Sequence, residues 1–100
     1  MTPSIRRKLE ALAERHEEIG RLLIEPSVSA DPQRFRALSR EYAHLEDVVG
    51  ALHEYDSAEA ALASAEAMRA DPELHELADE EARTQRERLQ TLGETLGVLL

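Results

Sequence analysis

The chain has 100 residues with a net charge of −9, and 42% of the residues are hydrophobic, 3% are aromatic and none is cysteine. This composition suits one small domain rich in helix, and it excludes disulfides and thiolate metal sites, which favours the cytoplasm. An acidic surface repels phosphate backbones, so we expect no direct grip on nucleic acid and a protein as the partner.

Three prolines each follow an oxygen-bearing side chain, in the pairs Thr2-Pro3, Asp31-Pro32 and Asp71-Pro72. A side-chain oxygen at the N-cap accepts a backbone N–H that the first turn leaves unpaired, and proline fits the first helical position. The sequence therefore predicts three helix starts.

The first predicted helix spans residues 3 to about 24, because Pro26 disfavours helical geometry at Glu25. Its apolar stripe has the spacing of a heptad seam and consists of Ile5, Leu9, Leu12, His16, Ile19 and Leu23. We expect His16 to be a partly buried, hydrogen-bonded imidazole in this stripe. The short segment EPSVSA then connects this helix to an antiparallel neighbour.

The second predicted helix spans residues 32 to about 70. Its heptad stripe begins with Phe35, Leu38, Tyr42, Leu45, Val49 and Leu52. The stripe then slips by one position, as a straight helix drifts against a seven-residue repeat, and continues as Val48, Leu52, Tyr55 and Leu62. Beyond residue 56 the helix becomes rich in alanine.

The third predicted helix spans residues 72 to about 98. It starts with Leu74, Leu77 and Ala78 and continues with Ala82, Gln85, Leu89, Leu92, Leu96 and Leu99. We predict one all-α domain over residues 1–100, an elongated three-helix bundle from which a long antiparallel two-helix hairpin projects. Large apolar residues fit the part with three layers, and alanines fit the two-layer arm.

Residue pairs with the spacing of known metal sites occur twice. Glu41 and His44 match one Glu-x-x-His motif of a di-iron bundle, which needs two such motifs. His75 and Asp79 lie four residues apart, as in a zinc helix, but acidic residues are also expected near a helix N-terminus. We predict no metal, cofactor or catalytic site. No apolar run approaches the roughly 20 residues of a membrane span, so we expect no signal peptide and no membrane contact.

Three stretches resemble a known family: PSIRRKLEALAERHEEI, DPQRFRALSREYAHLEDVV, and a DPEL that opens a last long helix ending in LGVLL. They are similar to the N-terminal helical domain of the bacterial peptide chain release factor 1 family. Members of this family are the class I factors that end translation at UAA and UAG codons. The resemblance covers essentially all 100 residues, and RFRALSREYA is its most specific part.

The resemblance implies that decoding and peptidyl-tRNA hydrolysis belong to later domains, which carry a Pro-Ala/Val-Thr tripeptide and a Gly-Gly-Gln motif. Neither occurs in residues 1–100, so we expect a non-catalytic, cytoplasmic domain without a cofactor. The resemblance also implies an arm that faces the stalk base proteins of the large ribosomal subunit. Its further partners would be the class II release factor GTPase and the remaining domains of its own factor.

Within that resemblance, we predict that the hairpin tip contacts a partner through Met68, Arg69, Asp71, Glu73 and Leu74. The alternative for these residues is that they only cap and close a turn. A different class of function is a free-standing helical adaptor or self-associating coiled-coil module, and a third is a metal-dependent helical-bundle enzyme. The isolated chain can self-associate through its apolar end, Val98, Leu99 and Leu100.

Overall fold

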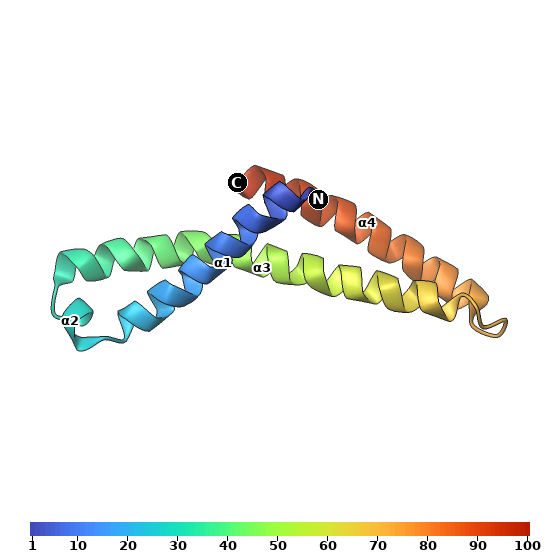
Figure 1. The fold of residues 1–100 in the computed structure, drawn as a ribbon, viewed down its shortest axis with the longest axis horizontal. Coiled ribbons are helices and arrows are strands. Elements are labelled where there is room, and N and C mark those ends of the chain that lie inside the picture. The colour runs from blue at the N-terminus through green and yellow to red at the C-terminus, as the bar shows by residue number, and fades with distance from the viewer. The chain divides into compact units, whose positions relative to one another are not determined.

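The computed structural model describes all 100 residues and contains four helices and no strand (Figure 1). The helices are α1 (Pro3–Leu23), α2 (Pro26–Ser29), α3 (Pro32–Met68) and α4 (His75–Leu99). The predicted all-α class is confirmed. None of the four helices has the length and apolar character that crossing a membrane requires.

The chain forms two compact units, residues 1–50 and residues 51–100. The first unit contains α1, α2 and the first part of α3, and the second contains the rest of α3 and α4. Each unit has its own buried side chains. The helix α3 therefore supplies packing surface to both units.

Side-chain caps start both long helices of residues 1–50. The Ile5 N–H donates to Thr2 Oγ1 across 3.2 Å, and the Arg34 N–H donates to Asp31 Oδ1 across 3.2 Å. Proline follows each capping residue, at the position where no N–H is needed. The structure thus has helix starts at Thr2 and Asp31, because each cap satisfies a donor that the first turn leaves unpaired.

The segment EPSVSA is more than a plain connection, because it contains the one-turn helix α2. Pro26 stands at the first helical position, and the N–H groups of Val28 and Ser29 both donate to the Glu25 carbonyl across 3.1 Å. Val28 is fully buried. The turn therefore adds an apolar side chain to the core as well as linking α1 to α3.

Large aliphatic side chains form the core of residues 1–50. The buried members are Ile19, Val28, Leu38 and Leu45, and the half-buried Leu12, Leu22, Leu23 and Tyr42 pack against them. Within residues 1–50 the predicted stripes differ from the structure at two positions, since Ile5 is 41% exposed and Phe35 is 39% exposed. Both residues lie in the first turn of a helix, where neighbouring elements surround a side chain on fewer sides.

Residues 51–68 of α3 and the whole of α4 form an antiparallel pair, here called the hairpin (Figure 1). Its contacts join residues whose numbers converge toward the connection: a Cβ built on Gly93 would lie 3.9 Å from Tyr55 Cε2, Arg86 bonds Glu66, and Arg69 bonds Asp79. Four alanines are buried in it: Ala58, Ala65, Ala78 and Ala82. The hairpin predicted from the sequence is confirmed, and so is its use of small buried residues.

The last helix begins at His75 and not at Pro72, where the sequence predicts its start. Asp71 has a different role from Thr2 and Asp31: its carboxylate accepts the N–H of Glu73 across 2.9 Å, and its carbonyl accepts the N–H of Leu74 across 3.1 Å. These bonds close a turn before the helix starts, because Asp readily bonds the backbone two residues on. The N-cap of α4 is Leu74, which has no side-chain capping bond.

Candidate functional site

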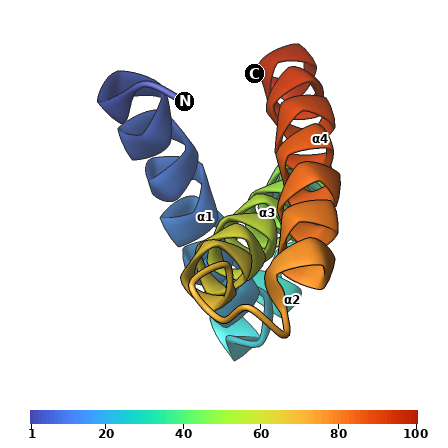
Figure 2. The ribbon, with the colours of Figure 1, turned by 90° about the vertical axis from the view of Figure 1, so that its right-hand side faces the viewer.

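The hairpin tip is the connection between α3 and α4, residues 69–74, which lies at the front of Figure 2. Backbone bonds close it: the N–H of Asp71 donates to the Met68 carbonyl across 3.1 Å, and that of Leu74 donates to the Asp71 carbonyl across 3.1 Å. Two successive turns and the Asp71 side chain thus bond the N–H groups of Asp71, Glu73 and Leu74, which gives the tip a defined shape.

The carboxylate of Asp79 ties the tip to α4. Arg69 Nε lies 2.6 Å from Asp79 Oδ1, and His75 Nε2 lies 3.2 Å from Asp79 Oδ2. The other ring nitrogen, His75 Nδ1, lies 3.1 Å from the Arg69 carbonyl oxygen. Both ring nitrogens of His75 therefore lie within hydrogen-bond distance of oxygen atoms of the same chain.

The five residues predicted as partner contacts divide into two groups in the structure. Met68 and Leu74 are each 37% exposed, and the exposed side chain of Glu73 forms no ion pair. Arg69 and Asp71 are engaged within the hairpin, in the ion pair and the turn described above. Arg69 and Asp71 therefore match the alternative in which tip residues only cap and close a turn. The side chains of Met68, Glu73 and Leu74 are available on the surface.

Sequence reasoning missed Leu77 as a surface residue. It was assigned to the apolar stripe of the last helix, but it is 62% exposed. The buried positions Ala78 and Ala82 set the stripe, and Leu77 lies about 100° around the helix from Ala78. Counting back along α4 from its buried leucines in steps of three and four gives this same stripe, so the signal was present in the sequence.

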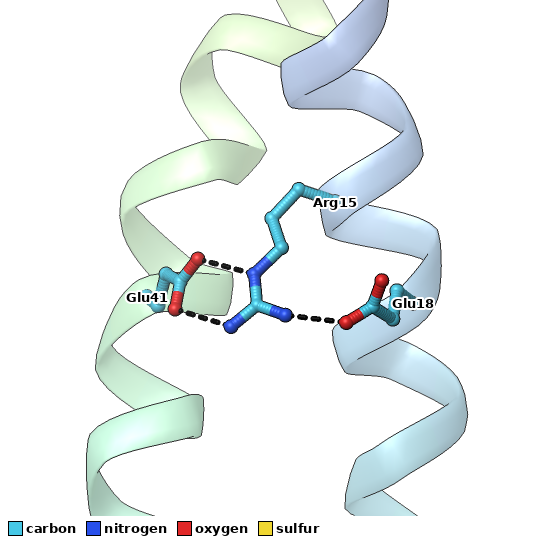
Figure 3. A network of polar contacts seen from close by, with 3 residues as sticks. All are labelled: Arg15, Glu18 and Glu41. Carbon is cyan, nitrogen blue, oxygen red and sulfur yellow. Dashed lines mark hydrogen bonds and ion pairs between the residues drawn. The ribbon is translucent and has the colours of Figure 1, made fainter.

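A second polar network joins α1 to α3 within residues 1–50 (Figure 3). The Arg15 guanidinium donates to both carboxylate oxygens of Glu41, from Nε across 2.7 Å and from Nη2 across 2.9 Å, and also pairs with Glu18. The hydrogen bond from Arg15 lowers the pKa of Glu41, and the same bond raises the pKa of Arg15. Such a two-point pair fixes the contact between the helices in orientation as well as distance.

This network assigns a structural partner to Glu41, one of the two residues with di-iron spacing. His44 is exposed, and no group of three His, Cys, Asp or Glu side chains is arranged to hold a metal ion. His75 and Asp79, the pair with zinc-helix spacing, form the ion pair beside the tip. The described partners of Glu41 and Asp79 are therefore arginine and histidine side chains of this chain.

His16 packs against an aromatic ring and has no hydrogen bond, which differs from the prediction. Its ring is stacked on Tyr42, with centroids 4.2 Å apart and planes inclined by 15°, and its Nε2 is buried without a hydrogen-bond partner in the chain. The expected partial burial is present. The aromatic face of Tyr42 takes the place of a polar partner, which the heptad spacing alone could not indicate.

Comparison with known proteins identifies a family and relatives of this chain. Residues 12–100 match the family model described as "PCRF domain". The chain is also 49% identical over all 100 residues to a protein named "Peptide chain release factor 1" from Xylella fastidiosa (strain 9a5c). The chain spans 28% of the length of that relative. No solved structure matches the chain.

Proposed function

The chain belongs to the PCRF domain family, and on that basis we propose that it is the helical N-terminal domain of a peptide chain release factor, which ends translation at UAA and UAG codons. The observation that carries this proposal is the 49% identity to "Peptide chain release factor 1", which extends over every residue of the chain. The resemblance of RFRALSREYA and its neighbouring stretches to the same family also supports it and depends on no structural feature.

In this proposal the domain contributes no catalytic group. Residues 1–100 contain no Gly-Gly-Gln sequence and no Pro-Ala-Thr or Pro-Val-Thr tripeptide. The strongest polar clusters are internal to the fold, since Arg15 holds Glu41 and Arg69 holds Asp79. Groups that are saturated by structural ion pairs are poorly placed to act as acids, bases or nucleophiles.

The role of the domain is then to face the ribosome through the hairpin tip. We infer that the partners of the domain are the stalk base proteins of the large subunit and the class II release factor GTPase, as the family resemblance implies. The acidic surface supports this assignment, because in an assembly rich in RNA a negatively charged arm is steered away from phosphates and toward basic protein.

The activity is tested with the intact factor that carries this chain, on ribosomes programmed with UAA, UAG or UGA and charged with a labelled peptidyl-tRNA. We expect peptide release at UAA and UAG and none at UGA. Residues 1–100 alone should release no peptide at any codon. Release at UGA would contradict the assigned codon class, and release by residues 1–100 alone would contradict the non-catalytic role.

The contact at the tip is tested by replacing Glu73 with Ala in the intact factor, because Glu73 is exposed and forms no ion pair within the chain. We expect slower ribosome-dependent release or recycling, with the helix content by circular dichroism unchanged. The matched control is Glu87→Ala, a change at an exposed residue in α4 that removes the same charge away from the tip. Equal activity of the tip variant and the unchanged factor would remove the tip from the proposal.

A second candidate function, self-association as a helical adaptor, is favoured by one feature of α4. Val98 is 86% exposed, and it borders a shallow groove of about 290 Å³ whose lining is Thr91, Glu94, Thr95, Val98 and Leu99. Sedimentation equilibrium of the chain tests this function. A dimer that Val98→Glu dissociates would support it, and a monomer at high micromolar concentration would exclude it.

A further inference from the structure

We propose that one side of the hairpin tip, formed by Met68, Leu74 and Leu77, is a docking surface for a basic protein that inserts an apolar group. This surface is here called the apolar tip patch. The inference rests on the proposed function and deepens it, because it names which side of the tip is used and what chemistry the partner must have.

Helical geometry places Met68 and Leu77 on one side of the hairpin, and Leu74 lies in the tip that joins their two helices. The Arg86–Glu66 ion pair, at 3.1 Å, bridges the two helices along one side. Leu77 precedes Arg86 by nine residues, which is two and a half turns, and Met68 follows Glu66 by two residues, which is about 200°. Each of the two apolar residues therefore points away from the side that the ion pair occupies.

The ion-paired side is closed by bonds within the chain. Arg86 is held by Glu66, and Asp79 is held by both Arg69 and His75. A partner that bound on this side would have to break these bonds or compete for them. The apolar side has no such bonds, because Met68, Leu74 and Leu77 offer only hydrocarbon and thioether surface.

Exposure marks the patch as a surface that the chain itself leaves uncovered. Leu77 is 62% exposed, and Met68 and Leu74 are each 37% exposed. Three large apolar residues lie within ten residues of sequence at the tip end of the hairpin, where the nearest buried residues are Ala65 and Ala78. Contiguous exposed apolar groups of this kind typically mark protein interaction sites, and methionine adapts to irregular partner surfaces.

Charge around the patch specifies the partner. Residues 66–81 contain seven acidic side chains and a single arginine. Glu73, Glu76 and Glu80 are exposed and form no ion pair within the chain. A partner that contacts the patch therefore gains by bringing Lys or Arg side chains against these carboxylates, whereas an RNA surface is repelled. The complementary surface is an apolar group with a basic rim.

Photo-crosslinking in the intact factor tests the side and the partner class together. A benzophenone amino acid is placed at position 77 or at position 86, the factor is bound to ribosomes stalled at UAA, and the irradiated products are identified by mass spectrometry. We expect cross-links to a lysine- and arginine-rich protein segment from position 77 and none from position 86.

The outcomes separate this inference from the proposed function. Cross-links from position 86 and not from 77, cross-links from both, or cross-links from 77 to ribosomal RNA would each overturn the apolar tip patch while release at UAA continues. A bound, active factor that gives no cross-link from either position would also overturn it. Loss of release by the unmodified factor at every stop codon would instead contradict the proposed function itself.

A matched pair of substitutions measures the contribution of the patch. Leu77→Gln should raise the factor concentration that gives half-maximal release about five- to tenfold, since a central apolar anchor is often worth 1 kcal/mol or more. Ile24→Gln changes another exposed aliphatic residue, 83% exposed and far from the tip in sequence, and should change that concentration by less than about twofold. Helix content should stay the same in both. Equal effects of the two variants would overturn the inference.

Discussion

Residues 1–50 bury Ile19, Val28, Leu38 and Leu45, whereas the hairpin buries Ala58, Ala65, Ala78 and Ala82 nearer its tip. The first unit thus gains its stability from the volume of large aliphatic side chains that leave water. In the tip half of the hairpin, small side chains let two helices approach closely, so less area is buried and the fit of the backbones matters more. Truncation of a buried side chain should therefore lower the free energy of unfolding most in the first unit. Enlargement of a buried side chain should lower it most in the hairpin.

The largest expected effect is truncation in the core of residues 1–50. Ile19 is fully buried, so Ile19→Ala removes apolar contacts and leaves a cavity, and should lower the free energy of unfolding by about 2–5 kcal/mol. Urea denaturation followed by circular dichroism measures this. The control Ile24→Ala, at a residue that is 83% exposed, should stay within about 0.5 kcal/mol. Similar losses from both variants would contradict the assigned core.

Enlargement of a hairpin alanine should have the next largest effect. Ala78 is fully buried, so Ala78→Leu forces the two helices apart and should lower the free energy of unfolding by about 1–3 kcal/mol. The control is Ala67→Leu, which adds the same atoms at an exposed position of α3. A neutral Ala78→Leu would mean that the helices of the hairpin do not pack as closely as the buried alanines indicate.

The smallest expected effect concerns the ion pair that orients α1 on α3. Arg15 lowers the pKa of Glu41 below its ordinary value of 4.5, so the folded state favours the ionised carboxylate. The pair therefore stabilises the fold above pH 4.5, and this contribution is lost as the pH falls through the lowered pKa. Because the Arg15 and Glu41 side chains are 37% and 41% exposed, Glu41→Gln should cost at most about 1 kcal/mol at pH 7.

The pH dependence separates this pair from general charge effects. The stability difference between Glu41→Gln and the unchanged chain should shrink as the pH is lowered from 7 toward 3, and high salt should shrink it further. Glu46→Gln, at an exposed residue without an ion pair in the chain, serves as the control and should show neither trend. A difference that grows at low pH would contradict the assigned direction of the Glu41 pKa.

The sequence predicted the elements better than it predicted their ends. Thr2 and Asp31 cap helices as their Pro neighbours indicate, but Asp71 in the same Asp-Pro pattern closes a turn, and α4 starts later. An Asp carboxylate can bond the N–H groups of a helix or those of a turn with similar geometry. The path of the chain after residue 71 decides between them, and that path is set by how α4 packs on α3.

The candidate site was predicted only in part, for a related reason. The position of a connection between two helices is local information, so the tip with Met68 and Leu74 was found. The bond of Arg69 to Asp79 depends on how the tip folds back onto α4, which cap residues fix only to within a few positions. The His75–Asp79 contact instead spans four residues within α4, so its spacing is visible in the sequence. The exposure of Leu77 follows from the spacing of the buried residues along α4, which the sequence also contains. Sequence reasoning therefore placed the connection between the two helices, but it did not show which side chains of the tip are bonded within the chain.

The central claim is that residues 1–100 help a release factor engage the ribosome and supply none of its chemistry. The most direct test measures peptide release at UAA by the intact factor and by the factor without residues 1–100, over a wide range of factor concentrations. The account predicts an unchanged maximal rate of release and a higher half-saturating concentration for the shortened factor. A shortened factor that remains folded and ribosome-bound, yet releases no peptide at saturation, would contradict the account.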